Sequence, residues 1–152
     1  IRDFFNQFHI MGETFETSVP WDRIHHVTAA VEDELHRQCK ARSVRGTPYL
    51  SYRVTQTYHT GVCIYFTMGF SGKGLERPDA AYHEIESSLR QAILDNGGSL
   101  SHHHGIGKIR ASFLKQIQSE ASLQVLRETK RALDPANIFG ARNGALADAA
   151  RE

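Results

Sequence analysis

The chain has 152 residues, with 18 lysines and arginines against 17 acidic residues. This length predicts one domain that buries about two-thirds of the surface exposed by its unfolded form. Because the net charge is close to zero, no basic field of the whole chain favours nucleic-acid binding. Two cysteines, Cys39 and Cys63, are too few for a disulfide scaffold, so we expect a reducing compartment. The absence of a run of about 18 apolar residues predicts a soluble protein.

Six elements are expected up to and including the histidine-rich segment. β-Branched and aromatic residues favour an extended segment over 9–19, and Ser18-Val19-Pro20-Trp21 is typical of a helix start. Apolar residues spaced by three and four predict that this helix runs to about Arg42. Alternation of apolar and polar residues predicts two strands, joined by a turn at 59–61. The expected elements that follow the first helix are strands over 50–57 and 62–70, a helix from Pro78 to Asn96, and a short strand over 99–104.

The order strand, helix, strand, strand, helix, strand predicts an α+β fold with a ferredoxin-like β-α-β-β-α-β antiparallel sheet and both helices on one face. Alternation should place Val54, Ile64 and Phe66 under the helices. The residues expected on the opposite face are Arg53, Thr55, Thr57, Tyr65 and Thr67. Beyond Arg110 a helical pattern continues to Leu133, where Asp134-Pro135 stops it before an irregular tail.

Three consecutive histidines, His102, His103 and His104, lie between a glycine pair and a Gly-x-Gly. Imidazole titrates near neutral pH, so this run suits either proton transfer or metal binding. If the segment is extended, His102 and His104 share a face and could bind zinc with a third ligand. No Cys-x-x-Cys or His-Glu-x-x-His motif accompanies them, and we therefore expect no metal. The following Gly105-Ile106-Gly107-Lys108 lacks the spacing of a phosphate-binding loop.

Several motifs that occur in order along the chain carry a resemblance to a known family. They are Met11–Arg23, Arg53–Tyr58, Cys63–Phe66, Gly97–Lys108 and Leu133–Gly140. In these motifs the chain resembles the carboxyl-terminal part of the alkyl-dihydroxyacetonephosphate synthase family, flavoproteins of the vanillyl-alcohol-oxidase-like superfamily. Flavin-linked hydroxyacid dehydrogenases resemble the chain less closely, because they carry Gly-Glu-His where this chain has its histidine run.

The resemblance implies an FAD-dependent transferase of ether-lipid synthesis, which exchanges the acyl group of acyl-dihydroxyacetone phosphate for a long-chain alcohol. Residues 1–145 would form the FAD-linked oxidase C-terminal domain, a cap over the substrate side of the flavin, and residues 146–152 a frayed tail. The domain that binds most of the FAD precedes the cap in this family. The chain begins without Met and offers no glycine-rich pyrophosphate loop, so we expect a fragment that is inactive alone.

The resemblance also assigns candidate site residues. Tyr65 matches the catalytic acid/base, and the run His102 to His104 matches the essential histidines. Arg2 matches the ligand of the substrate phosphate, and Arg142 and Asn143 lie in the active-site tail. The tail continues as Gly144-Ala145-Leu146 where the family often has two leucines.

The implied partners are acyl-dihydroxyacetone phosphate, a long-chain alcohol, the parent's own FAD-binding domain, a second copy in a homodimer, and a membrane surface reached through the full-length protein. Nucleic acid is not among them. The expected location is intracellular: cytoplasmic in a bacterium, peroxisomal in a eukaryote. Two alternatives stay open, namely the cap of a flavin-dependent 2-hydroxyacid oxidoreductase of the D-lactate or glycolate type, and a free-standing ferredoxin-like module that binds a metal through its histidines.

Overall fold

The computed structural model describes residues 4–5, 7–141 and 143–146. The chain folds as two compact units, which meet in the sequence between His104 and Gly105, where its length predicted one domain. The first unit contains β1 (Ile10–Pro20), α2 (Ile24–Ala41), β2 (Arg45–Thr57), β3 (Gly61–Ser71) and α3 (Pro78–Asp95), and the second contains α4 (Leu114–Ile117) and α5 (Glu120–Leu133). Short 3-10 helices cover Trp21–Arg23, Ala111–Phe113 and Gly144–Leu146. Within the described residues, no helix is both long and apolar enough to span a bilayer.

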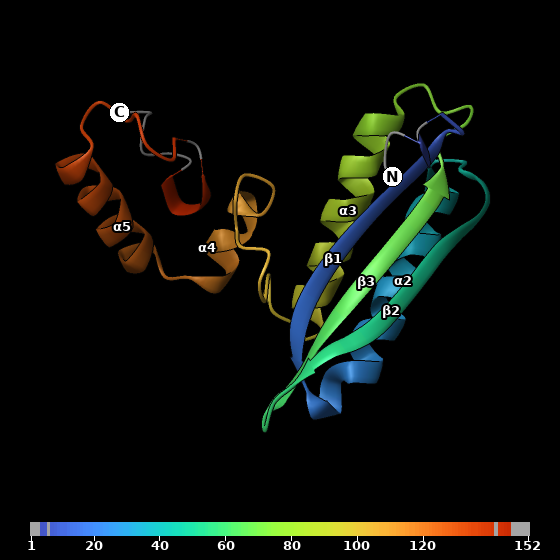
Figure 1. Cartoon of the computed structure of the whole chain (residues 1–152), viewed down its shortest axis with the longest axis horizontal. Coiled ribbons are helices and arrows are strands. Elements are labelled where there is room, and N and C mark those ends of the chain that lie inside the picture. Colours follow the sequence, from blue (N-terminus) through green and yellow to red (C-terminus); the bar gives the residue numbers. More distant parts are fainter. Residues whose placement is uncertain (1–3, 6, 142, 147–152) are drawn as a thin grey trace. The chain divides into compact units, whose positions relative to one another are not determined.

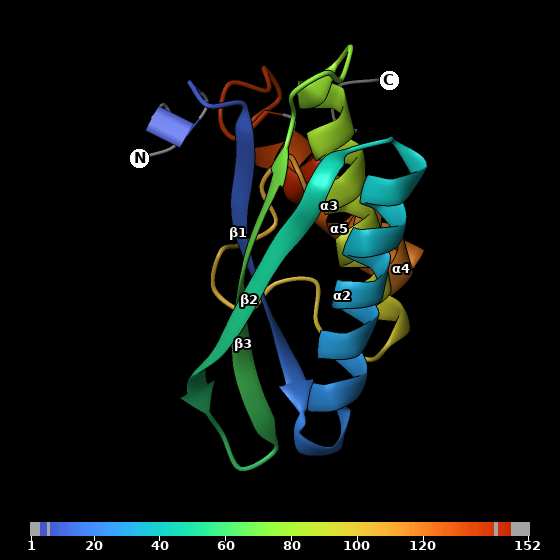
Figure 2. The same cartoon turned by 90° about the vertical axis from the view of Figure 1, so that its right-hand side faces the viewer.

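The sheet of the first unit has the strand order β1-β3-β2, and both neighbouring pairs are antiparallel. Helices α2 and α3 cover one face of this sheet (Figure 1), and the view turned by 90° shows strands and helices as two layers (Figure 2). The α+β class with both helices on one face is therefore confirmed. We call the sheet face away from α2 and α3 the open face.

The hydrophobic core lies between the sheet and the two helices. In the central strand β3 every second residue from Val62 to Phe70 belongs to the core and points toward α2 and α3. The Phe15 ring of β1 stacks on the Phe66 ring of β3, with centroids 4.9 Å apart. The helical residues packed in the same core are Val27, Val31 and Leu35 of α2 and Ile85, Leu89 and Ile93 of α3.

Strand β1 continues through Pro20, where the sequence predicted a helix start at Ser18. The reason is pairing, because Ser18 lies opposite Cys63 and Pro20 opposite Gly61 in the β1–β3 ladder. Residues Ser18 to Pro20 are thus held extended by the central strand.

The short fourth strand predicted over residues 99–104 does not form. Ser99 begins a ladder with β1, since its N–H donates to the Ser18 carbonyl at 2.9 Å. The Ser99 hydroxyl oxygen then accepts the Ser18 N–H at 2.9 Å, in the place of a backbone carbonyl. Further along, the N–H groups of His102, His103 and His104 donate to the buried side-chain carboxylate of Glu16, where a strand would use β1 carbonyls. Side-chain acceptors have therefore replaced the strand ladder.

Strand β2 contains a register shift between Val54 and Gln56 that the sequence did not predict. Arg53 still lies opposite Tyr65, on the open face, as expected. After the shift Gln56 lies opposite Cys63, also on the open face, and Thr57 lies opposite the core residue Val62. The expectation that Thr57 shares the open face was therefore wrong.

In the second unit the helix predicted from Arg110 to Leu133 is divided. Gln118 is extended, and Ser119 caps α5 by accepting the Ser122 N–H at 3.2 Å. Helix α5 ends where predicted, because Asp134 precedes Pro135 and accepts the backbone N–H of Phe139 at 2.8 Å.

Candidate functional site

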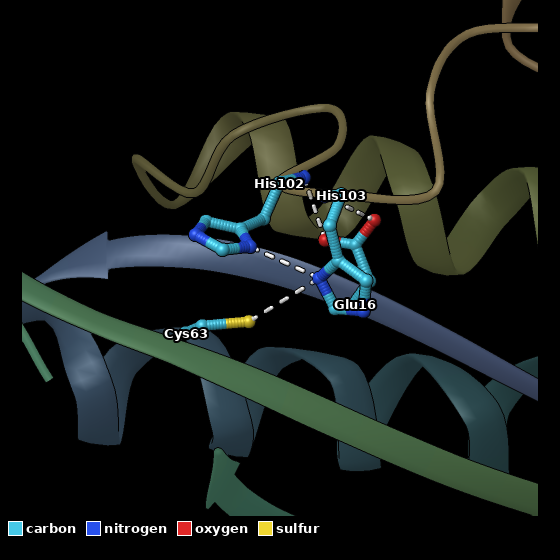
Figure 3. A group of neighbouring side chains, drawn as sticks. All are labelled: Glu16, Cys63, His102 and His103. Carbon is cyan, nitrogen blue, oxygen red and sulfur yellow. Dashed lines mark hydrogen bonds between the residues drawn. The ribbon is translucent and has the colours of Figure 1, made fainter. Parts of the chain in front are cut away.

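The Glu16 carboxylate fixes the histidine run. Glu16 lies on the open face of β1, opposite Tyr65, and its residue is 0% exposed. One carboxylate oxygen accepts the Ser101 hydroxyl at 2.8 Å and the backbone N–H groups of His104 and His103 at 2.9 and 3.3 Å. The other oxygen accepts the His102 N–H at 2.6 Å (Figure 3). Three consecutive backbone N–H groups therefore converge on a single side chain.

The ionisation of Glu16 reflects two opposed effects. Burial raises the pKa of the carboxyl, because it disfavours the charged form. The N–H of His104, the hydroxyl of Ser101 and the N–H groups of His102 and His103 all favour the carboxylate, and together they hold the pKa below its ordinary value. Glu16 is thus a buried anion at neutral pH, and the backbone N–H groups of the run stabilise its charge.

With the backbone fixed in this way, the three imidazoles lie against one another. The Nδ1 atoms of His102 and His103 are 3.0 Å apart and share a hydrogen bond (Figure 3). The His103 and His104 rings meet edge to face, with centroids 4.6 Å apart. The Nε2 atom of His102 lies 2.8 Å from the Tyr58 hydroxyl.

Tyr65 stands beside this run on the central strand. Its ring lies 5.5 Å from the His104 ring, edge to face, and 6.1 Å from the His103 ring. The Arg53 guanidinium lies over the Tyr65 ring at 5.2 Å, where a cation is attracted to the ring face. The Tyr65 hydroxyl donates to Thr14 Oγ1 at 3.1 Å, which fixes its direction. A phenol, three imidazoles and a guanidinium therefore meet on one open face.

The structure brings together four of the predicted site residues: Tyr65 and the three histidines. Asn143 belongs to the second unit, where its N–H donates to the Gly140 carbonyl at 3.1 Å. Arg2 and Arg142 lie outside the described residues, so their assignments stay predictions.

Sequence reasoning missed several residues that build the site, above all Glu16, Cys63, Gln56 and Tyr58. The alternation of β1 does place Glu16 on the same face as Thr14, and that signal was available. The positions of Gln56 and Tyr58 depend on the register shift in β2, which leaves no trace in the local pattern.

Four of these side chains offer the atoms that a metal ion could use. One atom each of Glu16, Cys63, His102 and His103 lies within 4.8 Å of the others (Figure 3). Zinc prefers such thiolate, imidazole and carboxylate ligands. The Glu16 oxygens already accept four hydrogen bonds, and the two Nδ1 atoms bond to each other. A metal would have to replace contacts that hold the run, which favours proton chemistry.

The open face is hollowed next to Tyr65. A cavity of about 740 Å³, lined mainly by apolar surface, extends along β1 and β3 from Thr14 and Thr67. Its floor includes Gly12 and Gly69, which lie opposite each other in the β1–β3 ladder. Both positions have room for a Cβ atom, so the hollow exists because neither residue carries a side chain. Its shape and lining suit an aliphatic chain.

Comparison with known proteins gives consistent results. Alkyldihydroxyacetonephosphate synthase from Caenorhabditis elegans is 40% identical over 143 residues, and its counterpart from Trypanosoma brucei brucei is 28% identical over 138 residues. These matches cover 94% and 91% of this chain but 24% and 22% of the relatives, so the chain spans about a quarter of their length.

A solved structure of an alkyldihydroxyacetonephosphate synthase matches 93% of this chain and 22% of its own chain. The TM-score is 0.64 at 22% sequence identity, which shows a shared fold. The model of the family described as FAD linked oxidases, C-terminal domain, matches residues 1–143, and the chain therefore belongs to this family.

Proposed function

We propose that this chain is the substrate-covering cap of an alkyldihydroxyacetonephosphate synthase-like enzyme, which exchanges the acyl group of acyl-dihydroxyacetone phosphate for a long-chain alcohol. The observation that carries the proposal is the placement of Tyr65 against His103, His104 and Arg53 on one open sheet face. The 40% identity to the Caenorhabditis elegans synthase supports the assignment of the reaction.

The residues of the open face fit the ring end of FAD better than its pyrophosphate. They offer imidazole nitrogens and phenol and hydroxyl oxygens, which are polar partners suited to a flavin ring and to a substrate bound against it. We propose that His103, His104 and Tyr65 face the flavin, whose other contacts come from a domain upstream in the full-length parent. When bound, FAD supplies an electron-accepting ring next to the substrate.

The chemistry of acyl exchange requires that a proton next to a ketone is removed and later returned. Tyr65 is suited to carry this proton, because Thr14 fixes its hydroxyl and imidazole rings stand beside it. Arg53 over the ring stabilises negative charge that develops on the phenol when it gives up its proton. An imidazole that has taken up a proton can likewise stabilise negative charge on the substrate oxygen.

The apolar hollow beside Tyr65 supports the substrate class. A hollow that begins at Thr14 can accept an aliphatic chain whose polar end lies at the Tyr65 hydroxyl. The floor formed by Gly12 and Gly69 lets this chain approach the backbone of the sheet.

The test uses the full-length parent enzyme and its Tyr65→Phe variant. The variant keeps the ring but loses the proton carrier, so alcohol-for-acyl exchange should fall by about a hundredfold or more with flavin content unchanged. Tyr52→Phe is the matched control, since Tyr52 projects from the core face of β2 and is half exposed. Turnover of Tyr65→Phe within a few-fold of wild type would remove Tyr65 from catalysis. Reduction of an electron acceptor by a 2-hydroxyacid, without exchange, would favour the oxidoreductase alternative.

A further inference from the structure

The register shift in β2 determines which side chains reach the histidine run. In an uninterrupted ladder Thr55 would lie opposite Cys63, and Gln56 would point toward α2 and α3. The shift places Gln56 opposite Cys63 instead, on the open face. Such a bulge commonly redirects a side chain next to a functional site.

Tyr58 directly follows the end of β2, and its side chain lies on the same face. The Trp21 indole N–H donates to the Tyr58 carbonyl at 3.0 Å, and the Tyr58 N–H donates to the Gly61 carbonyl at 2.7 Å. The Tyr58 ring lies 5.6 Å from the His102 ring. The backbone of Tyr58 is therefore held at both its N–H and its carbonyl while the ring reaches the run.

A chain of three hydrogen bonds leads from Gln56 into the run. The Tyr58 hydroxyl donates its single proton to Gln56 Oε1 at 2.9 Å. The phenol oxygen can then only accept from His102 Nε2, 2.8 Å away, so His102 carries its proton on Nε2. The Nδ1 atom of a neutral His102 is then an acceptor, and it receives the proton of His103 Nδ1 across 3.0 Å, with Cys63 Sγ at 4.0 Å from the same His103 nitrogen.

We propose that Gln56 and Tyr58 are positioning residues that fix the tautomers of His102 and His103 and leave Nε2 of His103 as an exposed basic atom. His103 is exposed, and within the described part of the chain its Nε2 atom has no hydrogen-bond partner. A proton that Tyr65 has taken up can therefore pass to this lone pair. When His103 Nε2 takes up a proton, His103 becomes an imidazolium and its Nδ1–H still donates to His102.

The arrangement deepens the function proposed above and rests on it for its kinetic effect. A neutral imidazole stacked beside the Tyr65 ring can take over from Tyr65 the proton that the exchange removes. Without this chain of hydrogen bonds, His103 would carry its proton on Nε2 in part of the molecules, and in those molecules Nε2 could not accept another proton. Gln56 and Tyr58 thus act through His102 and His103 and need no contact with the substrate.

The test compares three variants of these open-face residues in the full-length enzyme. Tyr58→Phe removes the phenol oxygen, and Gln56→Met removes the acceptor while keeping the length of the side chain. Gln56→Glu keeps an acceptor for the Tyr58 proton and should preserve activity. We expect Tyr58→Phe and Gln56→Met to lower kcat at least about tenfold with KM changed less than twofold. Thr57→Val is the matched control, because Thr57 lies opposite Val62, on the other face.

A second measurement reads the tautomers without turnover. In protein labelled with 15N on the histidine rings, at a pH where the rings are neutral, one-bond couplings show which nitrogen carries each proton. Wild type and Gln56→Glu should show His102 protonated on Nε2 and His103 on Nδ1, and the His103→Gln variant assigns the His103 signal. Tyr58→Phe and Gln56→Met should lose this preference.

The outcomes separate this inference from the proposed function. His103 protonated on Nε2 in wild type, or a Gln56→Glu enzyme as impaired as Gln56→Met, would overturn the inference by showing that the Gln56 amide donates and the chain runs in reverse. Unchanged kcat and tautomers in Tyr58→Phe would also overturn it. A wild-type enzyme that lacks exchange activity would contradict the proposed function alone, because the tautomer measurement would still decide the inference.

Discussion

Replacing Glu16 by Gln tests the idea that one carboxylate holds the histidine run. The substitution keeps the size and shape of the side chain but removes the charge and turns one acceptor oxygen into an NH₂ donor. If the amide oxygen stays with Ser101, His103 and His104, its NH₂ group faces the His102 N–H, which now donates to a carboxylate oxygen at 2.6 Å. Two donors then oppose each other in a buried site.

The expected loss follows from the hydrogen bonds. Leaving the His102 N–H without an acceptor costs about 1–3 kcal/mol. The three bonds that remain become bonds to a neutral acceptor, each weaker by roughly 0.5–1 kcal/mol. Relief from burying a charge offsets part of this cost. We therefore expect Glu16→Gln to lower the free energy of unfolding by about 2–4 kcal/mol.

The assay is denaturant unfolding of the 152-residue chain at several pH values, followed by circular dichroism. The folded-state pKa of Glu16 lies below its ordinary value, so its contribution is complete above the ordinary pKa and is lost as the pH falls through the lower folded-state pKa. The difference between wild type and Glu16→Gln should therefore be largest near neutral pH and shrink in acid. Glu32→Gln, an exposed position of α2, is the control. A Glu16→Gln chain within about 0.5 kcal/mol of wild type at neutral pH would refute this account of the run.

Three further predictions concern other parts of the chain. The Lys130 amine and the N–H groups of Ile138 and Phe139 lower the pKa of Asp134 to about 2, so Asp134 should titrate near that value by NMR in the folded chain. Its stabilising effect is complete above the ordinary aspartate pKa and is lost as the pH falls through about 2. Titration at about pH 4 would contradict the hydrogen bonds assigned to Asp134 at the end of α5. Gly69→Val in the full-length enzyme should raise KM for a long-chain acyl substrate about tenfold, as if two CH₂ groups were no longer buried, while a short-chain analogue is little affected; equal effects on both chains would place the aliphatic chain elsewhere. The purified 152-residue chain should retain neither FAD nor zinc after dialysis, and one equivalent of either would contradict our reading of the open face.

The sheet and its two covering helices could be predicted from the sequence because each has a strong and regular pattern. The alternation in β3 and the spacing of three and four in α2 reflect burial of one side against a common core. These patterns are regular because exposing a whole apolar face of a strand or helix to water would cost folding free energy.

The features that shape the site could not be read in this way. The missing fourth strand depends on Ser99 and Glu16, whose side chains accept N–H groups that a strand would otherwise use. The shift in β2 adds one residue without disturbing the pattern around it, so Thr57 was assigned to the wrong face. The histidine run was singled out from the sequence itself and Tyr65 through resemblance. Their proximity follows from tertiary contacts between β3 and the segment after α3.

The site depends on the register of the sheet more than on the packing of its core. All three strands contribute side chains from the open face: Glu16 from β1, Tyr65 from β3, and Gln56 from β2. A slip of β1 by one residue against β3 would turn Glu16 toward α2 and α3 and place Phe15 under the histidines, because the side-chain period of a strand is two. Substitutions among core residues that preserve this register leave the carboxylate in place. The stacked pair Phe15 and Phe66 lies in the ladder next to the pair Glu16 and Tyr65. The contact that holds Phe15 in the core therefore also keeps Glu16 and Tyr65 on the open face.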